Sequence, residues 1–139
     1  MPAENTYHSA VRSALTADGW TITHDPLTLS FGGRDLFVDL AAERAALAAE
    51  KSGRKIAVEI HSFILASPVR DLQEAVGQYE IYRTVLAELD AERTIYLAVQ
   101  RRAYEGLLGE QFGRFVISRL QIKLLVVDIE SEKVVTWIE

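Results

Sequence analysis

The feature that most constrains the fold is a nearly continuous apolar run from Ile122 to Val127. Such a run is typical of a central strand that is buried on both faces. Helical patterns, among them those at 67–89 and 104–120, alternate with predicted strands along the chain. Strands that alternate with helices in this way predict a mixed α/β fold, with helices packed on a sheet.

Local signals along the chain predict the remaining elements. We expect helices at 5–18, 41–50, 67–89 and 104–120, and strands at 20–23, 35–40, 55–63, 94–99, 122–127 and 134–138. The helix at 41–50 is predicted from six alanines and a leucine among charged residues, because alanine has the highest helix propensity. Ser67 and Pro68 suit the N-cap and the first position of the longest helix.

Composition indicates a single globular domain over residues 1–139. Of these 139 residues 49% are hydrophobic, which excludes disorder and provides for one buried core. The absence of cysteine excludes disulfides, thiolate zinc sites and cysteine nucleophiles. Neither a signal peptide nor an apolar stretch of membrane-spanning length is recognisable, so we expect a cytoplasmic protein outside the membrane.

The charge balance of the chain is acidic. Lys and Arg number 15 against 20 Asp and Glu, for a net charge of −5. This balance argues against sequence-independent binding of nucleic acid through bulk positive charge, although it leaves a local groove open. The arginines of residues 101–123 need not share a helix face, so we interpret that segment as a solvated surface.

Two predicted strands alternate between apolar and polar side chains, which places the two kinds on opposite faces. The strand at 55–63 separates Ile56, Val58 and Ile60 from Lys55, Ala57, Glu59 and His61. The strand at 35–40 separates Leu36, Val38 and Leu40 from Asp35 and Asp39.

If these two strands are neighbours, Asp35 and Asp39 converge on Glu59 beside His61. Carboxylates that lie close together repel, which raises a pKa or attracts a cation. Oxygen ligands suit Mg²⁺ or Mn²⁺, and such an ion can activate water beside a phosphate. The alternative is a solvated face of an antiparallel strand pair, which has the same alternation.

Gln78 and Tyr82 lie four residues apart and therefore share one face of the helix at 67–89. Their amide and hydroxyl groups can hold a substrate phosphate or a metal-bound water. The alternative is an exposed Gln78 and a half-buried Tyr82 without a chemical role.

His8 and His24 have no His or Cys at metal-ligand spacing, so we expect ordinary polar roles for both.

These features, in this order, resemble the PD-(D/E)xK nuclease-like superfamily: an acidic residue on one strand, Glu-x-Lys on the next, and a helix with Gln-x-x-x-Tyr. More closely, four stretches resemble XisH, the family of fdxN element excision controlling factors: GWTITHDPLTLSFGGRDLFVDL, KIAVEIHSF, GQYEIYR and VVTWIE. The resemblance covers essentially the whole chain. It implies a three-layer α/β/α, restriction-endonuclease-like core with a mixed central sheet.

The resemblance also implies a function in site-specific DNA rearrangement. XisH is required, with a small companion named XisI and a recombinase, for excision of a DNA element during heterocyst differentiation. We therefore expect an accessory factor that controls excision of a chromosomal element, with Mg²⁺- or Mn²⁺-dependent cleavage of DNA as one alternative. The other alternative is a catalytically inactive nuclease fold that binds an XisI-like companion. A homodimer is expected only from the general habit of soluble proteins.

The implied site can be assigned residue by residue. Glu59 falls on the glutamate of Glu-x-Lys, and Asp39 on the upstream aspartate. Asp35 is the alternative metal ligand, because it shares a strand face with Asp39. Gln78 and Tyr82 match the Gln-x-x-x-Tyr helix.

His61 departs from the family pattern, in which lysine is expected at this position. Histidine is shorter and only partly charged at neutral pH. It either substitutes for the lysine, ligates the metal, or marks a site that has lost catalysis. Lys55 is a further alternative source of positive charge, although it lies roughly 13 Å along the strand from Glu59, at about 3.3 Å per residue.

Overall fold

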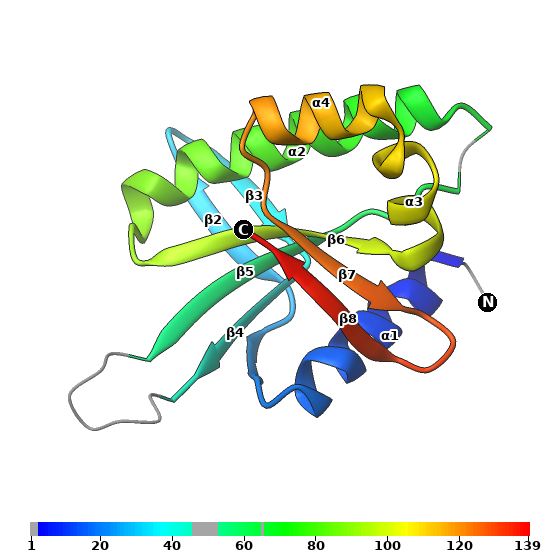
Figure 1. Ribbon diagram of the computed structural model, residues 1–139. Coiled ribbons are helices and arrows are strands. Elements are labelled where there is room, and N and C mark those ends of the chain that lie inside the picture. Colours follow the sequence, from blue (N-terminus) through cyan, green and yellow to red (C-terminus); the bar gives the residue numbers. More distant parts are fainter. Residues whose placement is uncertain (1–2, 46–52, 65) are drawn as a thin grey trace.

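The computed structural model describes residues 3–45, 53–64 and 66–139. Its elements, in chain order, are α1 (Ala3–Ala17), β1 (Thr21–His24), β2 (Leu27–Phe31), β3 (Arg34–Val38), β4 (Leu40–Arg44), β5 (Arg54–Ile60), α2 (Pro68–Leu89), β6 (Arg93–Gln100), α3 (Arg101–Glu105), the 3₁₀ turn η1 (Leu107–Gly109), α4 (Gln111–Arg119), β7 (Leu124–Asp128) and β8 (Lys133–Ile138). Figure 1 shows how they are arranged.

A six-stranded sheet in the order β1-β4-β5-β6-β7-β8 forms the centre of the fold. Strands β5, β6 and β7 run parallel, and the other neighbours in the sheet are antiparallel. Strands β2 and β3 form a separate antiparallel hairpin that contacts α2. The predicted mixed α/β fold with a mixed central sheet is therefore confirmed.

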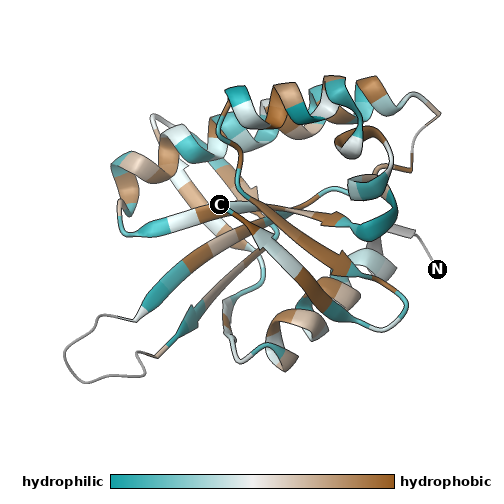
Figure 2. Cartoon of the chain, in the orientation of Figure 1, coloured by the Kyte–Doolittle hydropathy of each residue, from teal (hydrophilic) through white to brown (hydrophobic). Residues whose placement is uncertain are grey.

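Helices cover both faces of the sheet, as the apolar run at 122–127 required (Figure 1). On one face, α1 packs against β5 through Val11 and Leu15, which lie in one apolar cluster with Ile56 and Val58. On the opposite face, α2, η1 and α4 pack on a second cluster. Strand β7 contributes side chains to both clusters, and apolar residues follow its length (Figure 2). The layers are thus helix, sheet and helix.

The two elements that carry most of the predicted site are both present, although β5 ends at Ile60, so His61 follows the strand that was expected to extend to Phe63. In β5, Ile56 and Val58 face α1, whereas Ala57 faces α2. Helix α2 begins where the capping signal predicted it, with Pro68 in the first turn and the Ser67 hydroxyl oxygen accepting a hydrogen bond from the Arg70 N–H. The site-bearing strand and the helix after it were therefore both predictable from local pattern.

The predicted helix at 41–50 is wrong where the structure describes it, because Leu40–Arg44 is strand β4. It pairs antiparallel with β5, with Leu40 opposite Val58 and Ala42 opposite Ile56. Helix propensity is a weak preference that tertiary pairing overrides. Small alanines also fit a strand covered on both faces, where Ala41 and Ala42 are fully buried. Residues 46–50 lie outside the described part of the chain.

The predicted strand at 35–40 is in fact two strands, because β3 ends at Val38 and β4 begins at Leu40. Val38 packs in the cluster beneath α2, but Leu40 packs in the cluster beneath α1. The expectation that these two side chains share a face is therefore wrong. The chain leaves the hairpin and enters the main sheet at Asp39, which breaks the alternation at that residue.

Two further boundaries differ from expectation. Residues 27–31 form strand β2, for which no strand was predicted. The predicted helix at 104–120 is divided into α3, η1 and α4, with Gly106 following α3 and Gly109 ending η1. A Cβ atom at Gly113 would collide with the Leu107 carbonyl oxygen, so the packing of α4 on η1 requires glycine there. Over the described residues, none of the helices has the length and apolar character that crossing a membrane requires.

Candidate functional site

A cavity of about 470 Å³ lies where β5 ends, between α1 and α2. Its lining includes four predicted site residues: Asp39, Glu59, His61 and Gln78. A larger cavity of about 950 Å³ lies beside α4 and β8, but its lining contains none of the predicted site residues. The smaller cavity is therefore the candidate site.

Strand pairing brings Asp39 and Glu59 together. Because Leu40 lies opposite Val58, the residue before β4 lies next to the last residues of β5. The Asp39 carboxylate oxygen Oδ2 accepts a hydrogen bond from the Ile60 N–H at 2.8 Å. The Asp39 N–H donates in turn to Glu59 Oε1 at 3.4 Å. The first hydrogen bond joins the Asp39 carboxylate to the backbone of Ile60, and the second joins the Glu59 carboxyl group to the backbone of Asp39, so both groups are held at one end of the sheet.

Burial and like charge dominate the electrostatics of this pair. Glu59 is only 6% exposed. Burial raises the pKa of Glu59 to about 9, and the negative charge of Asp39 adds to the shift. Burial also raises the pKa of Tyr82, to which the charges of Glu59 and Asp39 contribute. Glu59 is therefore protonated at neutral pH unless a cation joins the pair.

The donor set of Asp39 and Glu59 fits a hard divalent cation. Two carboxyl groups facing one cavity provide oxygen ligands, and the remaining volume admits water. Mg²⁺ is held in proteins by one or two carboxylates with several waters, and Mn²⁺ accepts the same ligands. Either ion would compete with the proton on Glu59.

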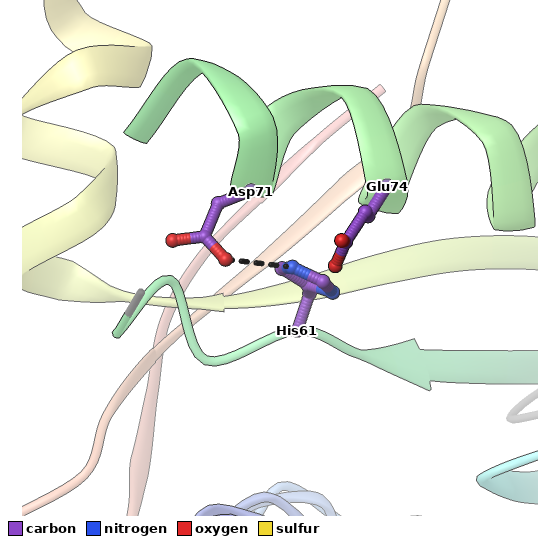
Figure 3. Close-up of side chains that lie close together, drawn as sticks. All are labelled: His61, Asp71 and Glu74. Atoms are coloured by element: carbon purple, nitrogen blue, oxygen red, sulfur yellow. Dashed lines mark hydrogen bonds and ion pairs between the residues drawn. The ribbon is translucent and has the colours of Figure 1, made fainter. Parts of the chain in front are cut away.

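His61 lies in the cavity but contacts helix α2. Its Nε2 atom is 3.3 Å from Asp71 Oδ1. Figure 3 marks this contact with a dashed line. Its backbone N–H donates to the Ala98 carbonyl oxygen at 3.0 Å, and its ring packs edge-on against Phe63. His61, which stands where the resemblance leads us to expect a lysine, is thus directed to a carboxylate that the sequence did not indicate.

The other predicted site residues are less central. Asp35 is exposed on the β2–β3 hairpin, where its carboxylate accepts a hydrogen bond from Ser30 Oγ at 2.7 Å, and it does not line the cavity. Gln78 is exposed at the cavity, while Tyr82 is half-buried beside it without lining it. Lys55 pairs with Asp90 at 2.9 Å. The geometry thus brings Asp39 to Glu59 and leaves Asp35 and Lys55 elsewhere.

Sequence reasoning missed Asp71 and Glu74, which also line the cavity. Their spacing of three places them on one face of the first turns of α2. That spacing was a usable signal, because the helix directly follows the strand that carries Glu59 and His61. His8 lines the cavity too, with Nε2 2.8 Å from Asp25 Oδ1, which is an ordinary polar contact.

Comparison with known proteins shows the family to which this chain is similar. The family described as XisH protein matches residues 1–135. A crystal structure of an XisH family protein from Nostoc punctiforme is 39% identical, with a TM-score of 0.88 over 96% of this chain and 99% of that chain. A crystal structure of an fdxN element excision controlling factor protein from Anabaena variabilis is 38% identical, with a TM-score of 0.87 over 97% of this chain and 99% of that chain. No curated protein matches. The chain belongs to the XisH family.

Proposed function

We propose that this protein controls the excision of a chromosomal DNA element, and that it does so as a metal-dependent endonuclease. The structural relative from Anabaena variabilis is named for control of fdxN element excision, which supports the first part. The second part depends on one observation: Asp39 and the buried Glu59 face one cavity, and the pKa of Glu59 is raised to about 9. Such a pair is a poor arrangement for an ion-free protein and a good one for binding a cation.

In this proposal the chain's own residues have separate roles. Asp39 and Glu59 hold Mg²⁺ or Mn²⁺ through carboxylate oxygens. The ion supplies Lewis-acid stabilisation of phosphate charge and lowers the pKa of bound water. Gln78, exposed at the cavity on α2, orients the water or a phosphate oxygen through its side-chain amide. Tyr82 is half-buried, and its pKa is raised above the ordinary value by burial and by the charges of Glu59 and Asp39, so its hydroxyl is neutral at physiological pH and can donate a hydrogen bond.

A second candidate function is a catalytically inactive nuclease fold that binds a small XisI-like companion. One observation favours it: His61, which stands where the resemblance leads us to expect a lysine, is directed to Asp71, away from the role of a cation beside the attacked phosphate. The acidic net charge of −5 is also better suited to a protein partner than to DNA. Self-association into a homodimer stays a prediction that light scattering tests.

Nicking of supercoiled plasmid tests the proposal. The full chain is incubated with Mg²⁺ or Mn²⁺ beside three variants: Glu59→Gln, His61→Lys and Glu88→Gln. Glu88 is the matched control, because it is an exposed glutamate of α2 that does not line the cavity. We expect nicking by the native chain and by Glu88→Gln, and at least a hundredfold loss in Glu59→Gln, as roughly expected when catalytic electrostatics are removed.

Two outcomes would overturn endonuclease activity. Nicking by His61→Lys alone would mean an intact scaffold that has lost catalysis at one residue. If neither the native chain nor any variant nicks the plasmid, with or without an added XisI-like protein, companion binding is left as the function. A pull-down of purified XisI-like protein by the native chain then tests that second candidate directly.

A further inference from the structure

A second group of potential metal ligands lies in the same cavity as Asp39 and Glu59. His61, Asp71 and Glu74 each offer one ligand atom, and these atoms all lie within 4.8 Å of one another. Figure 3 shows the His61 ring directed from the segment after β5 toward the two carboxylates of α2. No function assigned to the chain so far uses Asp71 or Glu74.

Local structure fixes the positions of these three side chains. The His61 N–H is hydrogen-bonded to the Ala98 carbonyl oxygen, which continues the β5–β6 pairing by one residue. The Ser67 cap and Pro68 set where α2 begins. Asp71 and Glu74 are three apart on this helix, so both carboxylates face the end of β5. A ligand set on rigid elements binds metal without first being assembled.

Burial distinguishes this cluster from an ordinary acidic surface. The Asp71 side chain is 2% exposed and the His61 side chain 15% exposed, whereas Glu74 is exposed at the cavity. A buried carboxylate is costly unless it is paired, hydrogen-bonded or coordinated to a metal. The His61 imidazole lies 3.3 Å from the Asp71 carboxylate, and both residues line the cavity of about 470 Å³. The geometry therefore combines two largely buried metal ligands with space for an ion and water.

We propose that His61, Asp71 and Glu74 bind a divalent transition-metal ion, with Zn²⁺ preferred over Mg²⁺. One imidazole nitrogen and two carboxylate oxygens form a set that Zn²⁺ accepts, with water in the fourth position. Imidazole is a good ligand for zinc and other transition metals, while Mg²⁺ selects oxygen. The bound ion places positive charge in the cavity that also holds Asp39 and Glu59. The two positive charges of the ion offset the two carboxylates that bind it, which removes negative charge from the cavity where the resemblance leads us to expect a lysine at position 61.

This site does not depend on the proposed nuclease activity. Its ligands differ from Asp39 and Glu59, and the metal preference differs as well, because one set contains nitrogen and the other only oxygen. Binding of Zn²⁺ can therefore be measured whether or not the protein cuts DNA, and plasmid nicking with Mg²⁺ is a separate readout.

Isothermal titration of the untagged full chain with Zn²⁺, and separately with Mg²⁺, tests the site. Four variants are compared: Glu74→Gln, His61→Gln, Glu59→Gln and the control Glu88→Gln. We expect one strongly bound Zn²⁺ per chain, and an affinity reduced at least about tenfold in Glu74→Gln and His61→Gln. Glu88→Gln should bind as the native chain does. Glu74 is exposed, so its replacement should leave the fold intact, which thermal melting verifies.

The absorption spectrum of bound Co²⁺ gives a second measure, because nitrogen ligation changes the visible bands. We expect the native spectrum to change in His61→Gln and to remain unchanged in Glu88→Gln. The proposal is overturned if Zn²⁺ does not bind, or if Glu74→Gln and His61→Gln bind it as tightly as the native chain. It is equally overturned if Glu59→Gln abolishes binding while Glu74→Gln does not, since the ion then belongs to the Asp39–Glu59 pair.

Discussion

The two ends of strand β5 differ in whether their charged side chains are paired with opposite charges. At the end near Lys55, opposite charges are paired: Lys55 with Asp90 at 2.9 Å, and Arg93 with Asp90 at 3.2 Å and Glu43 at 3.7 Å. At the end near Glu59, two carboxyl groups adjoin, and among the described residues neither forms an ion pair with a Lys or Arg side chain. One strand thus carries a compensated and an uncompensated cluster.

The pKa shifts express the same difference. Hydrogen bonds from Lys55 and Arg93 hold the pKa of Asp90 below its ordinary value. Burial and the charge of Asp39 raise the pKa of Glu59 to about 9. The first cluster therefore stabilises the folded chain, whereas the second opposes folding at any pH above about 4.5, where Glu59 is ionised in the unfolded chain. A carboxyl group in a cavity whose pKa is strongly raised by burial and a specific neighbouring charge is a candidate functional group.

The largest effect on stability should come from replacing Arg93, the buried cation at the Lys55 end of β5. The Arg93 side chain is 5% exposed and also donates to the Ile56 carbonyl oxygen at 3.0 Å. Arg93→Met leaves that buried oxygen and Glu43 without this partner, so we expect a loss of about 4 kcal/mol in the free energy of unfolding. Urea denaturation measures it.

The matched control for Arg93 is Arg101→Met, because Arg101 is 51% exposed and pairs with Asp128 at 3.5 Å. Removing an exposed pair of this kind should cost less than about 1 kcal/mol. Equal losses in the two variants would contradict the view that burial of Arg93 makes this end stabilising.

At the Glu59 end, we expect a substitution to increase the free energy of unfolding instead of lowering it. In the folded chain Glu59 keeps its proton up to about pH 9, whereas in the unfolded chain it ionises near 4.5. The folded state therefore binds more protons between these values, and stability falls as the pH rises through this window. Glu59→Gln removes that penalty, and at pH 7 without metal we expect it to be about 3 kcal/mol more stable than the native chain.

The pH dependence distinguishes this explanation from a change in packing. The advantage of Glu59→Gln should be nearly absent at about pH 4.5 and should grow toward pH 9, measured by urea denaturation in EDTA. The control Glu88→Gln should show no such trend. A variant less stable than the native chain at pH 8 would mean that ionised Glu59 is compensated after all.

Local pattern was sufficient for the elements that carry the site. Alternation predicted β5, a cap predicted the start of α2, and an apolar run predicted β7, because each signal lies within one segment. The strand at Leu40–Arg44 was not predictable in this way, since its alanines favour a helix until pairing with β5 decides the conformation. The change of face between Val38 and Leu40 likewise arises from the passage between two sheets.

In the candidate site, too, some residues could be predicted from local sequence and others depend on tertiary packing. Glu59 was predictable because it belongs to an alternating strand pattern and matches the XisH resemblance. Asp39 was predictable from the resemblance, although the strand expected to carry it is interrupted at that residue. The contact of His61 with Asp71 was not, because it depends on how α2 returns over the end of β5. The Asp71–Glu74 spacing was visible in the sequence, but only the packing of α2 turns it into part of the cavity.

The smallest effect is expected from Lys55, and it tests whether the compensated end is only a surface feature. The Lys55 side chain is 35% exposed, so Lys55→Met should cost about 0.5 kcal/mol at neutral pH, the range of partly exposed pairs. The lowered pKa of Asp90 means that this stabilisation is complete above the ordinary aspartate pKa and is lost as the pH falls through the lowered value. The native chain and Lys55→Met should therefore converge in stability under acid conditions, with 0.5 M salt reducing their difference at neutral pH. A difference that persists in acid would show that Lys55 acts by packing its alkyl chain, and the contrast between the two ends of β5 would then rest on Arg93 alone.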